Sequence, residues 1–262
     1  MRSASIVLAL HALTVASQDG DYAPYVDSES LQELINIKDL LKGSQVLQDI
    51  ADENDNTRAF GGGGHNATVD YIFKTIEDTG YFDVVKQPFT ETYSDAKGTL
   101  TIDDKEIPNG PLTYTPSGSA EGAALVKVAE LGCVSDNYPA ELEGAVAFTS
   151  RGECTFAEKS ILAKAAGAVG VIIYNNEPGD LSGTLGEPDG DYTPSLGITQ
   201  EASEAILAAL EEGDVTVDFN VDAVLEDRVS YNIIAETKGG DHDNVLILGG
   251  HTDSVPAGPG IK

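Results

Sequence analysis

Apolar residues spaced three and four positions apart recur along the chain, and most of these stretches end at a glycine. Such spacing places the apolar side chains on one face of a helix, and glycine is a common residue at a helix end. Ser30 and Glu33 have the pattern of a capping box at the start of the first stretch. The pattern predicts helices over 30–42, 44–51, 65–79, 156–166 and 200–210, with Gly43, Gly80, Gly167 and Gly213 as ends and Thr199 as the cap of the last helix.

Runs of β-branched and aromatic residues predict strands between these helices. The segment Phe82–Ile107 is strand-like, and shorter apolar runs follow at 145–148, 169–174, 215–221, 231–235 and 245–248. The strand–helix–strand order from 145 to 174 predicts a parallel pair joined by a right-handed crossover. We therefore expect a fold of the α/β class.

Changes of composition divide the chain into two units. Residues 108–120 are rich in Pro, Gly, Ser and Thr, which indicates a crossing into a second, compact unit. After residue 226, two short apolar strands joined by a polar turn indicate a return to the sheet of the first unit. The predicted organisation is a discontinuous α/β domain over 18–107 and 227–262, with an α/β module inserted at 108–226.

The N-terminus has the pattern of a secretory signal peptide. Arg2 forms a short basic region, residues 6–16 are mostly apolar, and the small residues Ala16 and Ser17 suit cleavage. We expect residues 1–17 to be removed and the protein to be secreted, outside the cell or into a vacuole. A buried N-terminal helix is the alternative. Elsewhere no segment approaches the ~20 apolar residues of a membrane span.

Two further features agree with secretion. Asn66-Ala67-Thr68 is an acceptor sequon for N-glycosylation at Asn66. Cys133 and Cys154 form an even number of cysteines, and an oxidising compartment favours a disulfide between them. Closing a loop of this length would stabilise the fold by about 3 kcal/mol. Two buried, unpaired thiols are the alternative.

The charge balance narrows the range of partners. The chain has 15 Lys and Arg against 44 Asp and Glu, a formal net charge of -29. Proteins bind nucleic acid and anionic membranes through Lys and Arg, so we expect neither as a partner. We interpret the acidity as a means of solubility, with a specific cationic partner as the alternative.

Residues with metal-binding chemistry lie near the C-terminal end. The apolar run Val245–Leu248 leads through two glycines to His251 and Asp253. Residues two apart on an extended segment point to the same side, so this pair suits a metal ligand and the acid that orients it. Taken alone, His251 is more typical of a surface or capped histidine. His242 is expected in a solvated turn and His65 at a helix start.

Three groups of motifs occur together between residues 28 and 261. They are Arg58-Ala-Phe-Gly61 before His65-Asn-Ala-Thr-Val-Asp-Tyr71; Ser150-Arg-Gly-Glu-Cys-Thr-Phe156 before Ala165-Ala-Gly-Ala-Val-Gly-Val-Ile-Ile-Tyr-Asn175; and Tyr231-Asn-Ile-Ile-Ala-Glu-Thr-Lys-Gly239 before Gly250-His-Thr-Asp-Ser-Val255 and Gly258-Pro-Gly-Ile261. In this combination they resemble the N-terminal half of secreted fungal aminopeptidases of the aminopeptidase Y type. These are zinc metallopeptidases with a protease-associated (PA) domain.

The resemblance implies a zinc-peptidase α/β domain with an inserted PA module, and a two-zinc exopeptidase that acts on peptides with a free N-terminus. In such sites two metals about 3.5–4 Å apart activate a water and polarise the scissile carbonyl. The resemblance implies that His251 is a ligand of one zinc ion. It implies that Asp253 is the catalytic-site acid that orients this imidazole. Arg58 is a candidate to anchor a carboxylate in the core.

The sequence also departs from the family pattern. The family continues from Gly-Pro-Gly-Ile to an Asn and then to a metal-bridging Asp, whereas here Lys262 takes the place of the Asn. The remaining ligands and the Glu general base of the family have no counterpart in the chain. We therefore expect an incomplete peptidase domain, no stable zinc binding and no peptide hydrolysis by this chain alone.

Three interpretations of the function remain. The first, which we favour, is an incomplete product of a zinc aminopeptidase gene. The second is a short secreted protein whose PA module binds peptides or a partner protease without catalysis, and the third is a related two-zinc hydrolase or cyclase. The strands 231–235 and 245–248 would expose apolar edges, so we expect poor solubility of the isolated chain.

Overall fold

The structure is a computed structural model that describes residues 28–260. It has two compact units, one that contains the described residues up to Asp49 and one from Ile50 to Gly260. The predicted signal peptide lies outside the described residues. Among the described helices, none has the length and apolar character of a membrane span.

The first unit is helical. α1 spans Ser28–Leu34, and α2 spans Ile37–Asp52 and continues into the second unit. The predicted helix end at Gly43 is wrong, because α2 runs through this glycine. The break falls instead at Asn36, whose side-chain oxygen accepts a hydrogen bond from the backbone N–H of Asp39 at 3.0 Å. A capping side chain decides this boundary, whereas one interior glycine costs a helix only about 1 kcal/mol.

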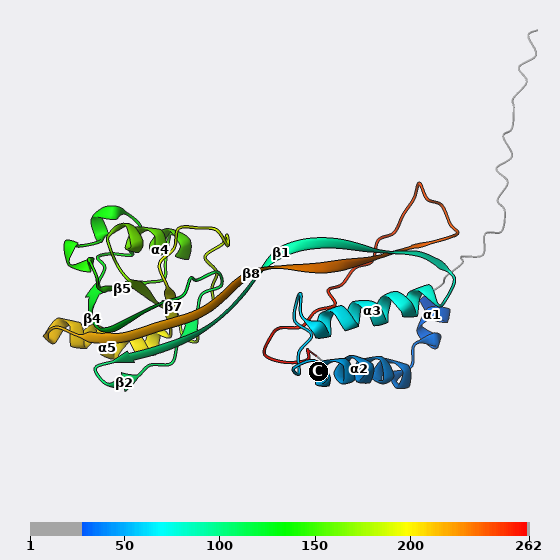
Figure 1. The fold of residues 1–262 in the computed structure, drawn as a ribbon, viewed down its shortest axis with the longest axis horizontal. Coiled ribbons are helices and arrows are strands. Elements are labelled where there is room, and N and C mark those ends of the chain that lie inside the picture. Colours follow the sequence, from blue (N-terminus) through cyan, green and yellow to red (C-terminus); the bar gives the residue numbers. More distant parts are fainter. Residues whose placement is uncertain (1–27, 261–262) are drawn as a thin grey trace, which may run out of the picture. The chain divides into compact units, whose positions relative to one another are not determined.

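Two long strands run through the second unit (Figure 1). β1 spans Phe82–Ile102 and β8 spans Thr216–Thr237, and they pair antiparallel along their length. The strand predicted from Phe82 is confirmed, but it ends at Ile102, and β2, Lys105–Glu106, folds back on it. The predicted strands 215–221 and 231–235 are parts of the single strand β8. Pairing with β1 continues through the polar residues between them.

The remaining strands extend this sheet in the order β2-β1-β8-β4-β5-β6-β7-β3. Their bounds are Gly110–Pro111 for β3, Gly118–Lys127 for β4, Val146–Ser150 for β5, Gly170–Tyr174 for β6 and Ser195–Ile198 for β7. β5 and β6 pair in parallel with α4, Phe156–Ala165, between them in sequence, so the predicted strand–helix–strand unit is confirmed. Two short 3-10 helices, η1 (Ser135–Asn137) and η2 (Ala140–Leu142), precede β5.

Side-chain hydrogen bonds begin the two helices that flank these strands. Thr155 and Glu158 form a reciprocal capping box at the start of α4. α5, Gln200–Glu212, begins at Thr199, whose hydroxyl accepts from the N–H of Ala202 at 3.1 Å, as predicted. Both threonines satisfy backbone N–H groups that have no partner within the helix.

Strand alternation sends neighbouring side chains into two separate cores. On β5, Phe148 lies in one core and Ala147 in the other, and Ile172 and Val171 of β6 are divided in the same way. α5 contributes to the first core and α4 to the second. A helix therefore covers each face of these central strands, and the predicted α/β class is confirmed. The predicted domain limits stay a prediction; β8 runs through residue 226.

The other end of the β1–β8 ribbon carries α3, Gly63–Glu77, on one face (Figure 1). The ammonium of Lys86 lies 4.8 Å from the ring centre of Phe73 on α3. Phe60, which precedes α3, packs on Phe89 of β1 with ring centres 6.0 Å apart. These contacts bring the glycine turn before α3 next to β8.

The segment that follows β8 forms neither helix nor strand. The predicted strand Val245–Leu248 is therefore wrong, and its four side chains are 63–87% exposed. A strand needs a neighbour for its backbone N–H and C=O groups, and no described strand pairs with this segment.

Candidate functional site

The segment from His251 to Gly260 lies against the turn that precedes α3. Ala59 and Ser254 form a parallel bridge, and the backbone N–H of Ser254 donates to the carbonyl of Arg58 at 3.1 Å. In return, the backbone N–H of Arg58 donates to the Ser254 hydroxyl at 3.0 Å. We call residues 251–260 the metal-site segment. These bonds join residues almost two hundred positions apart, so only the fold brings the metal-site segment to this place.

Arg58 closes the segment into a loop. Its side chain is buried, and it donates from Nη1 to the carbonyl of Thr252 at 2.6 Å and from Nε to the carbonyl of Pro259 at 3.1 Å. Burial lowers the pKa of this guanidinium, while the charge of Asp253 acts in the opposite direction. Arg58 was a candidate to anchor a carboxylate; its hydrogen bonds go to two carbonyls, and Asp253 acts on it through charge.

His65 holds the same segment from the other side. It lies in the first turn of α3, as expected, but its ring is buried between two hydroxyls. Nε2 lies 3.0 Å from Thr252 Oγ1, and Nδ1 lies 3.1 Å from Ser230 Oγ on β8. Burial, helped by the charge of Arg58, lowers the pKa of His65, and Asp253 opposes the shift. A neutral imidazole with one donor and one acceptor fits this position between two hydroxyls.

His251 and Asp253 meet as their spacing suggests. His251 Nδ1 lies 3.1 Å from a carboxylate oxygen of Asp253, and the side chain of His251 is 85% exposed. A carboxylate on Nδ1 leaves Nε2 free to face a metal, which is the usual arrangement of a histidine ligand and its orienting acid. Thr252 lies between them and is held by Arg58 and His65.

A zinc pair does not fit the described residues by themselves. Structural and catalytic zinc sites take three or four protein and water ligands. Within residues 28–260, no three His, Cys, Asp or Glu side chains converge on one point. The pair at 251 and 253 therefore supplies one imidazole and its carboxylate, and no complete metal site.

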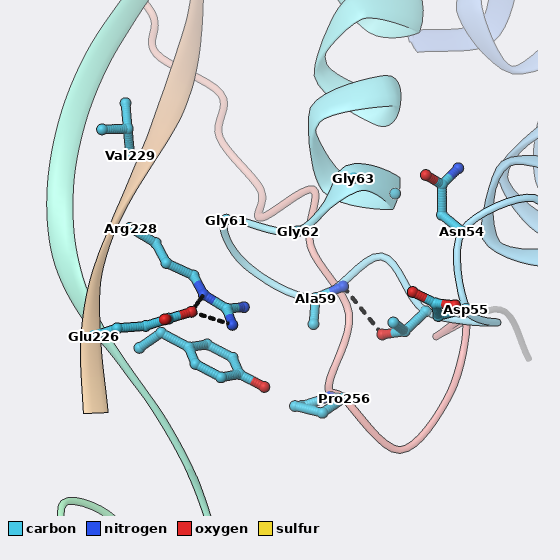
Figure 2. Close-up of a pocket in the computed structure, with 13 residues that line it drawn as sticks. Asn54, Asp55, Ala59, Gly61, Gly62, Gly63, Glu226, Arg228, Val229 and Pro256 are labelled. Carbon is cyan, nitrogen blue, oxygen red and sulfur yellow. Dashed lines mark hydrogen bonds and ion pairs between the residues drawn. The ribbon is translucent and has the colours of Figure 1, made fainter. Parts of the chain in front are cut away.

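A cavity of about 550 Å³ adjoins this segment (Figure 2). Pro256 lies on one side of it and the glycine turn at 61–64 on another, with Arg228 and Glu226 of β8 opposite. The Arg228 guanidinium stacks 3.4 Å from the ring centre of Tyr93 and pairs with Glu226 at 2.6 Å. The lining contains cationic and anionic side chains as well as hydrogen-bond donors and acceptors. Such a lining suits a polar ligand more than an apolar one.

Two glycines make the turn possible. Gly61 has φ +67°, and an added Cβ would lie 2.5 Å from Arg228 Cβ. A Cβ on Gly64 would lie 2.1 Å from the carbonyl oxygen of Thr57. Both positions therefore require glycine, because a side chain would separate the turn from β8 or from residue 57.

The other predicted site residues lie away from this segment. Cys133 and Cys154 form a disulfide with Cα atoms 5.6 Å apart, which confirms the predicted pairing. Asn66 is exposed on the first turn of α3, and the hydroxyl of Thr68 is buried and donates to the carbonyl of Gly64. His242 is exposed and lies 2.6 Å from a carboxylate oxygen of Glu236.

Comparison with known proteins agrees with this arrangement. Residues 120–206 match the PA domain family and residues 232–262 match Peptidase family M28. The chain is 44% identical over 256 residues to "Probable leucine aminopeptidase 2" of Aspergillus fumigatus, covering 96% of the chain and 51% of that protein. It is 41% identical to "Leucine aminopeptidase 2" of Arthroderma otae, covering 98% of the chain and 53% of that protein. The chain is thus similar to leucine aminopeptidases over about half of their length, and its residues 232–262 are similar to Peptidase family M28.

Solved structures extend the comparison. The aminopeptidase from Aneurinibacillus sp. strain AM-1 superposes with a TM-score of 0.68 at 30% identity, covering 83% of this chain and 53% of that one. A zinc aminopeptidase from Bacillus subtilis superposes with a TM-score of 0.60 at 28% identity, covering 83% and 51%. The chain thus spans about half the length of the relatives that it matches. Zinc use is a property of this family.

The sequence identified only part of the set of residues that hold the metal-site segment. Arg58 and His65 stand in the motif that resembles the family entry segment, but Ser230 and Thr252 carried no signal of their own. The available clue was an arginine and a histidine on either side of four glycines. Cationic side chains that become buried at such a turn need hydrogen-bond partners.

Proposed function

We propose that this protein supplies the PA module and one side of the metal site of a secreted zinc aminopeptidase, which removes residues from the free N-terminus of peptides. The observation that carries the proposal is the His251–Asp253 pair, with its imidazole exposed on a segment that buried residues hold in place. The match to Peptidase family M28 covers this pair.

Within this function, residues of the chain hold the metal-site segment in place and orient the His251 imidazole. Asp253 orients the His251 ring through Nδ1, and Arg58 and His65 hold the backbone and hydroxyl of Thr252 between them. We assign no catalytic step to the chain alone, since one imidazole does not bind a zinc pair.

The test uses the native gene product and begins with the message across the codon for Lys262. If the reading frame continues, we expect the translated protein to hydrolyse leucyl-p-nitroanilide and to lose this activity with a zinc chelator. Asp253→Asn should lower kcat/KM about 10–100-fold, the usual effect of losing a carboxylate that orients a histidine ligand. His242→Ala, on an exposed turn, is the control and should leave kcat/KM unchanged. Full activity in Asp253→Asn would contradict the proposal.

A non-catalytic PA protein is the second candidate. It is supported by the PA-matching region, which contributes to two buried cores and holds a disulfide of its own. If the message stops after Lys262, this candidate replaces the first. It then predicts metal-independent binding of peptides by the chain, measured by fluorescence anisotropy with a labelled peptide library.

Secretion and glycosylation belong to the same proposal. The disulfide and the exposed side chain of Asn66 support passage through an oxidising secretory compartment. We expect the secreted protein to start after residue 17 and to lose mass on deglycosylation, and Asn66→Gln to abolish that loss. Protein retained in the cytosol with its N-terminus intact would contradict secretion, and cell fractionation separates an extracellular from a vacuolar destination.

A further inference from the structure

We propose that the Cys133–Cys154 disulfide is a reducible switch of the PA module, in which the buried ammonium of Lys159 stabilises Cys133 as the leaving thiolate. The inference rests on the surroundings of the disulfide and does not depend on the proposed aminopeptidase function.

Lys159 lies against the disulfide with its charge poorly compensated. The residue is fully buried on α4, and its Nζ lies 3.7 Å from Cys133 Sγ. Nζ also donates a hydrogen bond to the carbonyl of Leu131. Among the described carboxylates none forms an ion pair with Lys159. The carboxylate of Glu158, its neighbour in sequence, accepts a hydrogen bond from the backbone N–H of Thr155, with the nitrogen and oxygen 2.8 Å apart. Burial lowers the pKa of this lysine, against the charges of Glu153 and Glu158, which raise it. A buried ammonium without an ion pair is costly.

Reduction would place an anionic sulfur directly beside this ammonium. An external thiolate attacks Cys154 Sγ, the S–S bond breaks, and Cys133 Sγ leaves with the electron pair as a thiolate 3.7 Å from Lys159 Nζ. When the attacking molecule is a dithiol, its second thiol then attacks the mixed disulfide and releases Cys154. The dithiol is oxidised by two electrons and the protein disulfide is reduced by two. Cys133 and Cys154 are both partly exposed, so a thiol can reach the bond.

The loops on both sides of the bond are held in strained conformations. Glu130 and Glu153 each have φ 50°, in the left-handed region that side chains other than glycine rarely adopt. Each stands within three residues of a bridged cysteine, so breaking the bond releases one constraint that holds these conformations. Tyr138 also ties the first loop, since its hydroxyl donates to the carbonyl of Gly132 at 2.8 Å. We expect reduction to loosen residues 130–133 and 152–154 and to leave the two cores intact.

The first experiment measures which sulfur leaves, in the unaltered 262-residue chain. Brief treatment with reduced glutathione, followed by acid quenching and alkylation, should trap a mixed disulfide at Cys154 and an alkylated thiol at Cys133. Peptide mass mapping measures the ratio, which we expect to exceed ten to one. Equal trapping at both cysteines, or an excess at Cys133, would overturn the proposal.

The second experiment measures the equilibrium with reduced and oxidised dithiothreitol. We expect Lys159→Met to shift the thiol–disulfide equilibrium about tenfold toward the disulfide, which is about 30 mV for a two-electron couple. Lys159→Gln keeps a donor for the Leu131 carbonyl but removes the charge, and it should shift the equilibrium as far as Lys159→Met. If Gln instead restores the original equilibrium, Lys159 only holds the loop and the proposal fails. Lys164→Met, on an exposed lysine of the same helix, is the matched control and should change nothing.

Discussion

At the scale of single residues, three basic side chains buried in the second unit each have polar partners. Arg58 donates to two carbonyls, His65 lies between two hydroxyls, and Lys159 lies against a carbonyl and a disulfide sulfur. Burying such groups without hydrogen bonds costs several kcal/mol, so the partners explain why each one is tolerated. The first two secure the metal-site segment.

Arg58→Met should weaken the fold and release the segment. The substitution removes two hydrogen bonds from a charged donor, so we expect the free energy of unfolding to fall by about 2–4 kcal/mol. Urea denaturation measures this change, and amide exchange at Ser254 reports the segment. Lys74→Met, which breaks an exposed pair with Asp78, is the control and should leave the free energy of unfolding almost unchanged. A cost below about 1 kcal/mol for Arg58→Met would show that the segment is held by other contacts.

His65 should make the fold sensitive to mild acid. Its pKa is lowered in the fold, by burial first and then by Arg58, against Asp253. The unfolded chain therefore binds a proton that the folded chain excludes, and the free energy of unfolding falls as pH drops below about 6.5. The slope is at most about 1.4 kcal/mol per pH unit for one proton. His65→Gln should remove this component between pH 7 and 5, measured by urea denaturation. An unchanged slope in the variant would assign the acid sensitivity to other groups.

At the scale of elements, caps and close approaches set where helices begin. Asn36, Thr155 and Thr199 each accept a backbone N–H at a helix start, and these contacts agree with the sequence rules for capping. Glycines occupy two different kinds of position in this chain. Gly43 lies in the middle of a helix with nothing near it, whereas Gly64 lets α3 touch the turn before it.

Gly64→Ala should therefore destabilise the protein and Gly43→Ala should not. The new methyl at residue 64 would lie 2.1 Å from the Thr57 carbonyl oxygen, so the turn must move. We expect a loss of about 2–4 kcal/mol in the free energy of unfolding. At residue 43 the methyl meets open space, and helix propensity should raise the stability of α2 by up to about 1 kcal/mol. Thermal melts followed by circular dichroism measure both. Equal effects would contradict the close approach at Gly64.

At the scale of the whole molecule, the chain combines a well-packed PA-matching region with an exposed apolar segment. Val245–Leu248 exposes its four side chains, and Val85, Val229 and Ile234 of the ribbon are also about half exposed. Apolar patches of this kind mark surfaces that associate.

We expect the isolated chain to associate through this segment. Leu246→Lys together with Leu248→Lys should increase the monomer fraction, because charged side chains oppose the association of apolar edges. Light scattering after size-exclusion chromatography measures the fraction. Val134→Lys changes another exposed apolar side chain outside the segment and serves as the control. A monodisperse unaltered chain would contradict this expectation.

Local patterns in the sequence determined the elements whose partners are close in the chain. β5, α4 and β6 follow one another within about thirty residues, and their apolar periodicity, caps and order were enough to predict a parallel strand–helix–strand unit. The two-residue spacing of His251 and Asp253 predicted their pairing in the same way. Both predictions depend on short-range geometry that the backbone imposes. The disulfide was predicted on other grounds, namely the even number of cysteines and the oxidising compartment.

Tertiary structure decided what depends on distant partners. Val245–Leu248 has the composition of a strand, but within residues 28–260 no strand lies beside it to complete its hydrogen bonds. β8, in contrast, continues through polar residues because β1 lies beside it. The contacts of Arg58 and His65 join positions 165 to 201 residues apart. No local pattern encodes such contacts, because which buried donor meets which acceptor is settled only when the chain has packed.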